Sequence, residues 1–183
     1  AFRQALAPFL EYYSDGTLHG RMMHLFQEIK KLDATSARGL RTVGNGILTA
    51  EGRELFTHFR FTPSCNIGEM VPMKARYDAA TCVYSVVDFA IGEVKFPKGA
   101  THLELRFGVL GVDFETKVYK MFMGAPLLLA KGVAVGSFSL TPTVLPDAGL
   151  HRFAFVGICF YQELNGVRYV LREDGNVGVA VVV

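Results

Sequence analysis

Apolar side chains recur with two different periods along the chain, and the change falls at about residue 58. Before it, they are spaced three and four residues apart, which places them on one face of an α-helix. The longest stripe is expected to follow an N-cap at Thr17. Its members are Leu18, Met22, Leu25, Phe26, Ile29 and Leu32. This first part of the chain is therefore predicted to be helical.

Two shorter helices are predicted on either side of this one. An apolar stripe within residues 2–13 indicates the first. Pro8 lacks the amide hydrogen that an interior helical position donates, so this helix is expected to be kinked or to begin late. Residues 49–56 indicate the third helix, with Thr49 as its N-cap and Glu51 near the positive end of the helix dipole.

From about Phe59 the period changes to two. Residues 102–107 place leucine and phenylalanine on one face and polar or charged side chains on the other, which is typical of a half-buried strand. Comparable runs predict strands at 73–77, 81–89, 112–116, 118–123, 133–140, 152–164, 167–171 and 177–183.

Two dipeptides in the last part of the chain indicate tight turns. Asn165-Gly166 lies between two strand-like runs and matches a type I′ hairpin, in which both central residues have positive φ. Asp174-Gly175 repeats this signal one strand later. The chain is therefore predicted to end in a three-stranded antiparallel meander.

Strands at intervals of about ten residues are typical of an antiparallel β-sandwich of immunoglobulin-like size. The predicted class is α+β, with a helical segment over residues 1–58 and a β-sandwich domain over residues 59–183. The chain has no tryptophan, and its three cysteines lack the spacing of the antibody-type pair.

Composition bears on partners and compartment. Hydrophobic residues make up 50% of the chain and the mean hydropathy is +0.27, so we expect part of the apolar surface to be covered by another chain. A formal net charge of +2 does not favour nucleic-acid binding. No apolar run approaches the roughly 18 residues of a membrane span. Free cysteines and the absence of a secretion signal favour cytoplasmic synthesis, with an extracellular site or an assembled particle left open.

Residues 33–46 (DATSARGLRTVGNG) combine hydroxyls, arginines and glycines, as a phosphate-binding loop would. A Walker-type loop requires lysine where this segment has Asn45, and the loop should follow a strand. We therefore predict a bend between helices, in which Arg38 and Arg41 pair with neighbouring groups.

The other candidate reactive groups are scattered. None of the five histidines has another histidine four residues away, so no metal site or cofactor is predicted. Cys159 lies in an apolar run, where burial would leave it inert, and Cys65 is expected to be the most accessible thiol. Asp113 and Glu115 share a strand face and are interpreted as a solvated edge. No catalytic residue is predicted, and the protein is not expected to be an enzyme.

Two apolar segments are candidates for contacts with another chain. Residues 119–129 are expected either to cover the core or to form an adhesive patch, with the core favoured. The final β-branched strand is expected either to be central in its own sheet or to complete the sheet of a neighbour. The predicted assembly interface combines this strand with the helical arm, and its residues are Val177, Val179, Val181, Val183, Leu18, Met22 and Leu25.

Three segments are similar to a family of uncharacterised bacterial proteins: residues 33–43 (DATSARGLRTV), 56–61 (FTHFRF) and 157–166 (GICFYQELNG). The resemblance implies a helical N-terminal segment joined to a β-rich C-terminal half, and further sequence before residue 1. It implies no activity, cofactor or catalytic residue.

The leading functional hypothesis is a non-enzymatic structural protein that self-associates as a homo-oligomer, as a subunit of a filament, shell or surface layer. The alternative is a β-sandwich module that binds a small molecule or a glycan. Tyr161, Tyr169 and His151 are its candidate carbohydrate-stacking platform.

Overall fold

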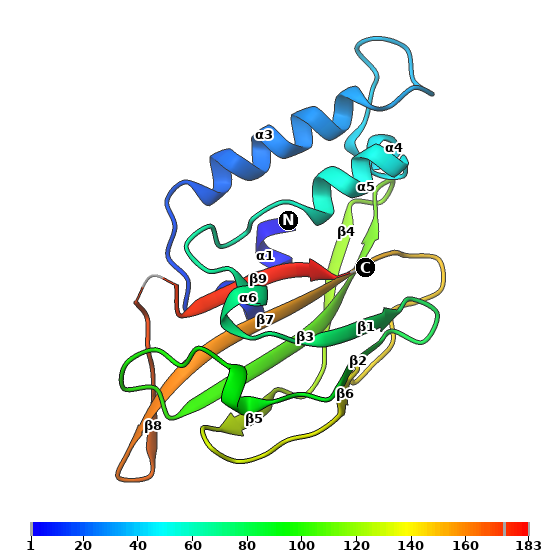
Figure 1. The fold of residues 1–183 in the computed structure, drawn as a ribbon. Coiled ribbons are helices and arrows are strands. Elements are labelled where there is room, and N and C mark those ends of the chain that lie inside the picture. Colours follow the sequence, from blue (N-terminus) through cyan, green and yellow to red (C-terminus); the bar gives the residue numbers. More distant parts are fainter. Residues whose placement is uncertain (1, 174, 183) are drawn as a thin grey trace.

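A computed structural model describes residues 2–173 and 175–182, and in it the chain forms three layers (Figure 1). Helices cover one face of a six-stranded sheet, and a three-stranded sheet covers its other face. The predicted α+β class, with N-terminal helices followed by antiparallel strands, is confirmed.

The helical layer comes mostly from the first sixty residues. Its elements are α1 (Phe2–Ala5), α2 (Ala7–Leu10), α3 (Leu18–Lys31), α4 (Val43–Ile47) and α5 (Ala50–Thr57). The later α6 (Ile67–Met70) packs instead in the cluster that the two sheets share. The first predicted helix is interrupted at Leu6, just before Pro8, as the missing amide hydrogen requires. The short helix α4, which contains two glycines, was not predicted.

Two helix starts differ in how they are capped. Thr49 caps α5 as predicted, since its hydroxyl accepts a hydrogen bond from the Gly52 N–H at 3.0 Å. Thr17 occupies the N-cap position of α3, but its side chain does not cap the helix. Instead, the Asp15 carboxylate accepts hydrogen bonds from the N–H and the hydroxyl of Thr17, each at 2.7 Å.

Two long antiparallel strands form the centre of the larger sheet. β3 (His102–Asp113) and β7 (His151–Leu164) pair over eleven residues. Two shorter strands, β4 (Val118–Met123) and β5 (Leu127–Ala130), lie along the free side of β3. Similarly, β8 (Val167–Val170) and β9 (Val177–Val182) lie along the free side of β7.

The smaller sheet has the order β1 (Lys74–Asp78), β2 (Val83–Val87) and β6 (Phe138–Leu140), and a short 3-10 helix, η1 (Ile91–Glu93), follows β2. Its buried side chains share one cluster with the facing side of the larger sheet. Tyr84 stacks on Phe107 across this interface, with ring centroids 5.6 Å apart. The strands thus form two facing sheets of three and six strands, both antiparallel.

Aromatic side chains connect the helical layer to the opposite face of the larger sheet. Phe56 of α5 is fully buried and packs edge-on against Phe61, Phe153 and Phe155. The buried stripe of α3, which contains four of the six predicted residues, belongs to the same cluster. The helical segment is therefore packed directly on β7 and β9.

Two predicted strands had wrong boundaries, and one strand was not predicted. β3 continues to Asp113, whose carboxylate then accepts hydrogen bonds from the N–H groups of Glu115 and Thr116 and turns the chain. The predicted strand at 112–116 is therefore the end of β3 and a turn. Only Phe138–Leu140 of the run 133–140 is a strand, and β5 was not predicted.

The predicted terminal meander was also wrong, although its first hairpin is confirmed. β9 pairs with β7, as β8 does, so the two strands follow one another along one side of β7. Phe160 marks the junction: its carbonyl accepts a hydrogen bond from the Leu171 N–H at 2.9 Å, and its N–H donates to the Asn176 carbonyl at 3.3 Å. Gly175 has a φ of +92°, and Asp174 lies outside the described residues.

Candidate association surface

The residues predicted for the assembly interface are mostly occupied inside one chain. Leu18, Met22 and Leu25 are buried between α3 and the rest of the helical layer. Val177 and Val179 are only 5% and 4% exposed. Val181 packs partly against the same buried cluster as Val179, and Val183 lies outside the described residues.

A distant segment covers the outer edge of β9. The Thr62 hydroxyl accepts a hydrogen bond from the outward-facing N–H of Val179 at 2.9 Å. Beside it, Cys65 and Ile67 approach Gly178 so closely that a Cβ there would lie 2.7 Å from the Cys65 sulfur. Residues 61–67 therefore close this part of the sheet edge, and a neighbouring chain cannot pair with Val179 in its place.

The edge of β8 is built differently. Asn165 and Gly166 have φ values of +52° and +78°, so the β7–β8 turn is the predicted type I′ turn. Since Leu171 bonds to Phe160, the alternation of an antiparallel pair directs the N–H and C=O groups of Arg168 and Val170 away from β7. β8 is the last strand on this side of the sheet order.

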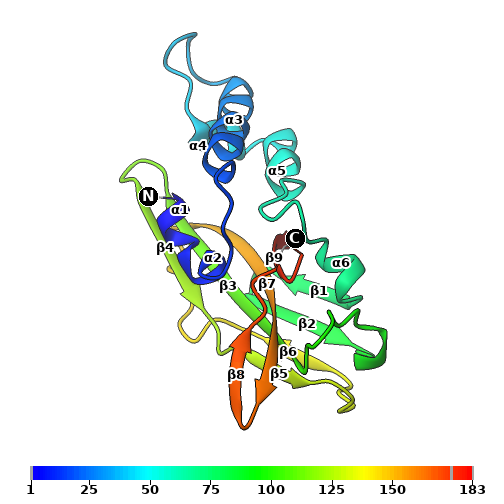
Figure 2. The same cartoon turned by 90° about the vertical axis from the view of Figure 1, so that its left-hand side faces the viewer.

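One face of the β7–β8 hairpin is apolar and open to solvent. Leu164, Val167 and Tyr169 are 52%, 51% and 55% exposed. They share a face, because Leu164 is directly opposite Val167 and Tyr169 is two residues further along β8. The hairpin tip extends beyond the rest of the sheet, at the end of the molecule opposite to the loop between α3 and α4 (Figure 2). We call these three side chains and the outer edge of β8 the hairpin surface.

The edge of β1 carries charges that discourage pairing with another chain. β1, the outer strand of the smaller sheet, exposes Lys74, Arg76 and Asp78. The charged side chain of β8, Arg168, instead donates to the Glu163 carboxylate at 3.0 Å, on the face opposite the apolar one. The hairpin surface is therefore less protected by charge than the edge of β1.

The glycine-rich segment 33–46 is a bend, as predicted. The buried Asp33 carboxylate holds it together and accepts hydrogen bonds from the N–H groups of Thr35, Ser36 and Thr42 and from the Asn45 amide. Burial alone would raise the pKa of Asp33, but these hydrogen bonds outweigh it and hold the pKa well below its usual range.

Of the two arginines in this bend, Arg41 pairs as predicted, donating to the Lys31 carbonyl at 2.9 Å. Asn45, at the position where a phosphate-binding loop has lysine, is hydrogen-bonded within the bend. These contacts give the segment a structural role in joining α3 to α4.

The three cysteines are buried and form no disulfide. Burial raises the pKa of Cys159 to about 11, as its apolar sequence context predicted. Cys65 is the most exposed of the three, as predicted, but it is only 8% exposed, and burial raises its pKa to about 11. Its loop-like sequence did not reveal that the loop packs under β9.

The remaining candidate groups do not gather into one site. Tyr161 is buried on the helical side of the sheet, Tyr169 is on the hairpin surface, and His151 is at the other end of β7, so the proposed stacking platform is not formed. Within the described residues, no group of three potential ligands could hold a metal ion. Asp113 closes a turn with the N–H of Glu115 and is not part of an acid/base pair.

Residues 119–129 pack against the core, as favoured from sequence. They form β4 and most of β5, and Phe122 and Leu129 are buried. Met121 and Met123 pack against the helical cluster.

The sequence did not indicate a polar cluster that fastens α2 to the large sheet. Arg106 of β3 pairs with Glu104, donates to the Pro8 carbonyl at 2.6 Å and lies over the ring of Tyr12. Tyr161 also donates to Glu104, at 3.3 Å. The alternation along β3 had placed Arg106 and Glu104 on a polar face, but the partners come from distant parts of the chain.

Comparisons with known protein families, curated proteins and solved structures gave no match. Among the described helices, none has the length and apolar character needed to cross a membrane.

Proposed function

We propose that this protein is a non-enzymatic structural protein that self-associates through the hairpin surface, as a subunit of a filament, shell or surface layer. The observation that supports this proposal is an unprotected outer strand whose neighbouring apolar side chains are more than half exposed. Neighbouring apolar side chains that are exposed together can form a contact with another protein.

The occupant that we propose for this edge is β8 of a second copy. Arg168 and Val170 direct their backbone groups outward, and Tyr169 lies between them. A two-fold axis through Tyr169 would place Arg168 of each copy opposite Val170 of the other. This pairing would form four backbone hydrogen bonds and join the two large sheets into one.

The side chains are also self-complementary in this arrangement. Each Tyr169 would face its counterpart across the axis, with Val167 beside it on the same face. Burial of this apolar surface would contribute about 25 cal/mol per Å² before the costs of association are subtracted. Because the same patch is used by both copies, the contact closes as a dimer.

The test is the solution mass of the purified protein, measured by light scattering over a concentration series. Wild type is expected to reach at least twice the chain mass of 20.1 kDa. Tyr169→Glu places two like charges at the axis and should remain a monomer. Val144→Glu, which changes an apolar side chain exposed elsewhere, is the matched control and should behave as wild type. A wild type that is monomeric at every concentration would contradict the proposal.

Imaging then separates a dimer from a larger assembly. A two-fold contact alone stops at two copies, so filaments or shells require a second contact surface. Negative-stain images of the wild-type protein should show regular large particles if the structural role is correct. If the images show only dimers, the hairpin contact is still supported, but the filament, shell and surface-layer proposals are contradicted.

A further inference from the structure

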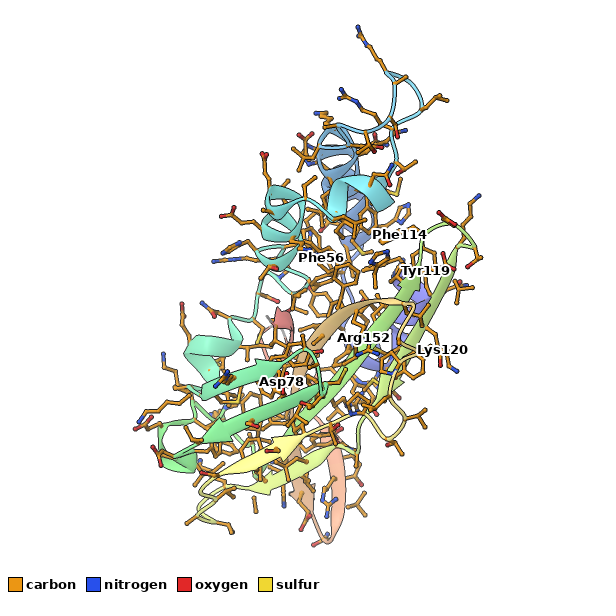
Figure 3. All side chains as sticks on the ribbon, turned by 90° about the vertical axis from the view of Figure 1, so that its right-hand side faces the viewer. Phe56, Asp78, Phe114, Tyr119, Lys120 and Arg152 are labelled. Carbon is orange, nitrogen blue, oxygen red and sulfur yellow. The ribbon has the colours of Figure 1, made fainter. Side chains whose placement is uncertain are left out.

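The start of β7 borders a cleft that is remote from the hairpin surface. The cleft has a volume of about 360 Å³ and lies where α5, the turn after β1, the start of β7 and the end of β9 meet. Figure 3 shows Arg152 between Phe56 of α5 and Asp78 at the end of β1. A volume of this size is in the range of small-molecule sites.

The wall of the cleft is largely apolar. Leu48 and Phe56 contribute from the helical layer, Phe153 and Ala154 from β7, and Val181 from β9. These side chains come from both sides of the large sheet's end, which explains why no local sequence pattern indicated the cleft. A ligand that fills it must present an apolar body.

The charged side chains that line the cleft are basic. Arg53 of α5 and Arg152 of β7 face it, together with His151, whose ring lies 5.5 Å from that of Phe114. Arg152 donates to the Pro146 carbonyl at 2.8 Å and to the Cys82 sulfur at 3.7 Å. Within residues 2–173 and 175–182, neither arginine forms a salt bridge with a carboxylate.

Two nearby groups complete the polar surroundings. The Asp78 carboxylate accepts hydrogen bonds from the Ala80 N–H and the Thr81 hydroxyl, so it is committed to its own turn. The buried Tyr77 hydroxyl has no hydrogen-bond partner among the described residues. Burial raises the pKa of Tyr77, with a further contribution from Cys82, so this hydroxyl stays protonated and can donate.

We propose that this cleft binds a small carboxylate with an apolar body, of the size of a medium-chain fatty acid, whose head group pairs with Arg152 and Arg53. A guanidinium group matches a carboxylate through two parallel hydrogen bonds, and partial burial strengthens the pair. The apolar walls select the body, and the two basic side chains select the charge. This inference does not depend on self-association, because the cleft and the hairpin surface lie at opposite ends of β7.

The test is a calorimetric titration of the wild-type protein with three probes. Decanoate has both the charge and the apolar body, decanol has the body without the charge, and acetate has the charge without the body. Decanoate is expected to bind at least about tenfold more tightly than either of the others, since one hydrogen bond to a charged group is worth about that factor. No decanoate binding would overturn the proposal, as would equal binding of decanol or of acetate.

Variants locate the binding. Arg53→Glu alters an exposed side chain and should weaken decanoate binding at least about tenfold without changing the melting temperature. Arg152→Gln should have a similar effect. Arg168→Gln, on the hairpin, is the control and should bind as wild type. If Arg152→Gln fails to fold because its contact with Pro146 is lost, Arg53→Glu alone tests the site. Unchanged decanoate binding in Arg53→Glu would then contradict the proposed site.

Discussion

β8 and β9 lie one after the other along the same side of β7, but only one of them has an open outer edge. β9 is buried by residues 61–67, and Thr62 bonds to its outward N–H at Val179. Among residues 2–173 and 175–182, no segment covers β8 in this way, and its apolar face is exposed. In β8 and β9, therefore, a distant segment, and not the hydrophobicity of the strand itself, decides which edge is available to another chain.

The largest expected effect comes from removing the covered strand. Deletion of residues 179–183 removes Val179, which is part of the core. The truncated protein should lose more than about 4 kcal/mol of unfolding free energy, because burial of Val179 contributes about 1.5–3 kcal/mol, partial burial of Val181 and Val182 adds to it, and the pairing of these residues with β7 is lost as well. Urea denaturation followed by circular dichroism measures this loss. An unchanged midpoint would show that β9 is dispensable for folding.

A smaller loss is expected when only the cover of β9 is altered. Thr62→Val leaves the buried N–H of Val179 without its acceptor and should lower the unfolding free energy by about 1–3 kcal/mol. Thr143→Val, at an exposed position, is the control and should stay within about 0.5 kcal/mol of wild type. If the two variants are equally stable, the hydrogen bond from Val179 does not hold the edge closed.

Acid should destabilise the helical layer without acting on β8 or β9. The pKa of Asp33 is lower in the folded than in the unfolded protein, so its contribution to stability is present above about pH 4 and declines as the pH falls below that value. The difference in unfolding free energy between wild type and Asp33→Asn should therefore shrink between about pH 5 and pH 2.

Denaturation curves across this pH range, with exposed Asp147→Asn as the control, measure the effect of Asp33. If the difference in unfolding free energy between wild type and Asp33→Asn is independent of pH, the pKa of Asp33 is not lowered in the folded protein.

The smallest effect on stability is expected at the open strand. Tyr169→Glu changes an exposed side chain and should alter the unfolding free energy of the monomer by less than about 0.5 kcal/mol. Thermal melting at low protein concentration provides the measurement. A loss as large as that of Thr62→Val would place Tyr169 in the core and remove the contrast between the two strands.

Features with local signals were predicted well from the sequence. The α3 stripe, the Thr49 cap and the Asn165-Gly166 turn each depend on residues a few positions apart. The Asp174-Gly175 signal was interpreted as a second hairpin, but the following strand, β9, pairs with β7 and not with β8. Turn-forming residues are compatible with pairing of β9 to β8 or to β7. The pairing of Val177 with Cys159 places β9 beside β7.

Features that depend on distant contacts were not predicted. The final valine-rich strand looked available for assembly, because the sequence does not show that Thr62 would cover it. Residues 127–130 form a strand only because they pair with residues 102–105. The cleft beside Arg152 combines residues from α5, β1, β7 and β9, so neither its apolar walls nor its two arginines were visible as a motif.

In the proposed dimer, two copies pair through β8. A cross-link between the two Tyr169 positions, at the two-fold axis, is the most direct test of this pairing. In the proposed pairing, the two Tyr169 residues are directly opposite without sharing hydrogen bonds, which places their Cα atoms about 4.5 Å apart, within the range that a disulfide can span. The three native cysteines are buried and should not compete. Mild oxidation of Tyr169→Cys should give a covalent dimer at low micromolar concentration, while Val144→Cys stays monomeric. A Tyr169→Cys protein that remains monomeric, or that cross-links no faster than Val144→Cys, would contradict the account.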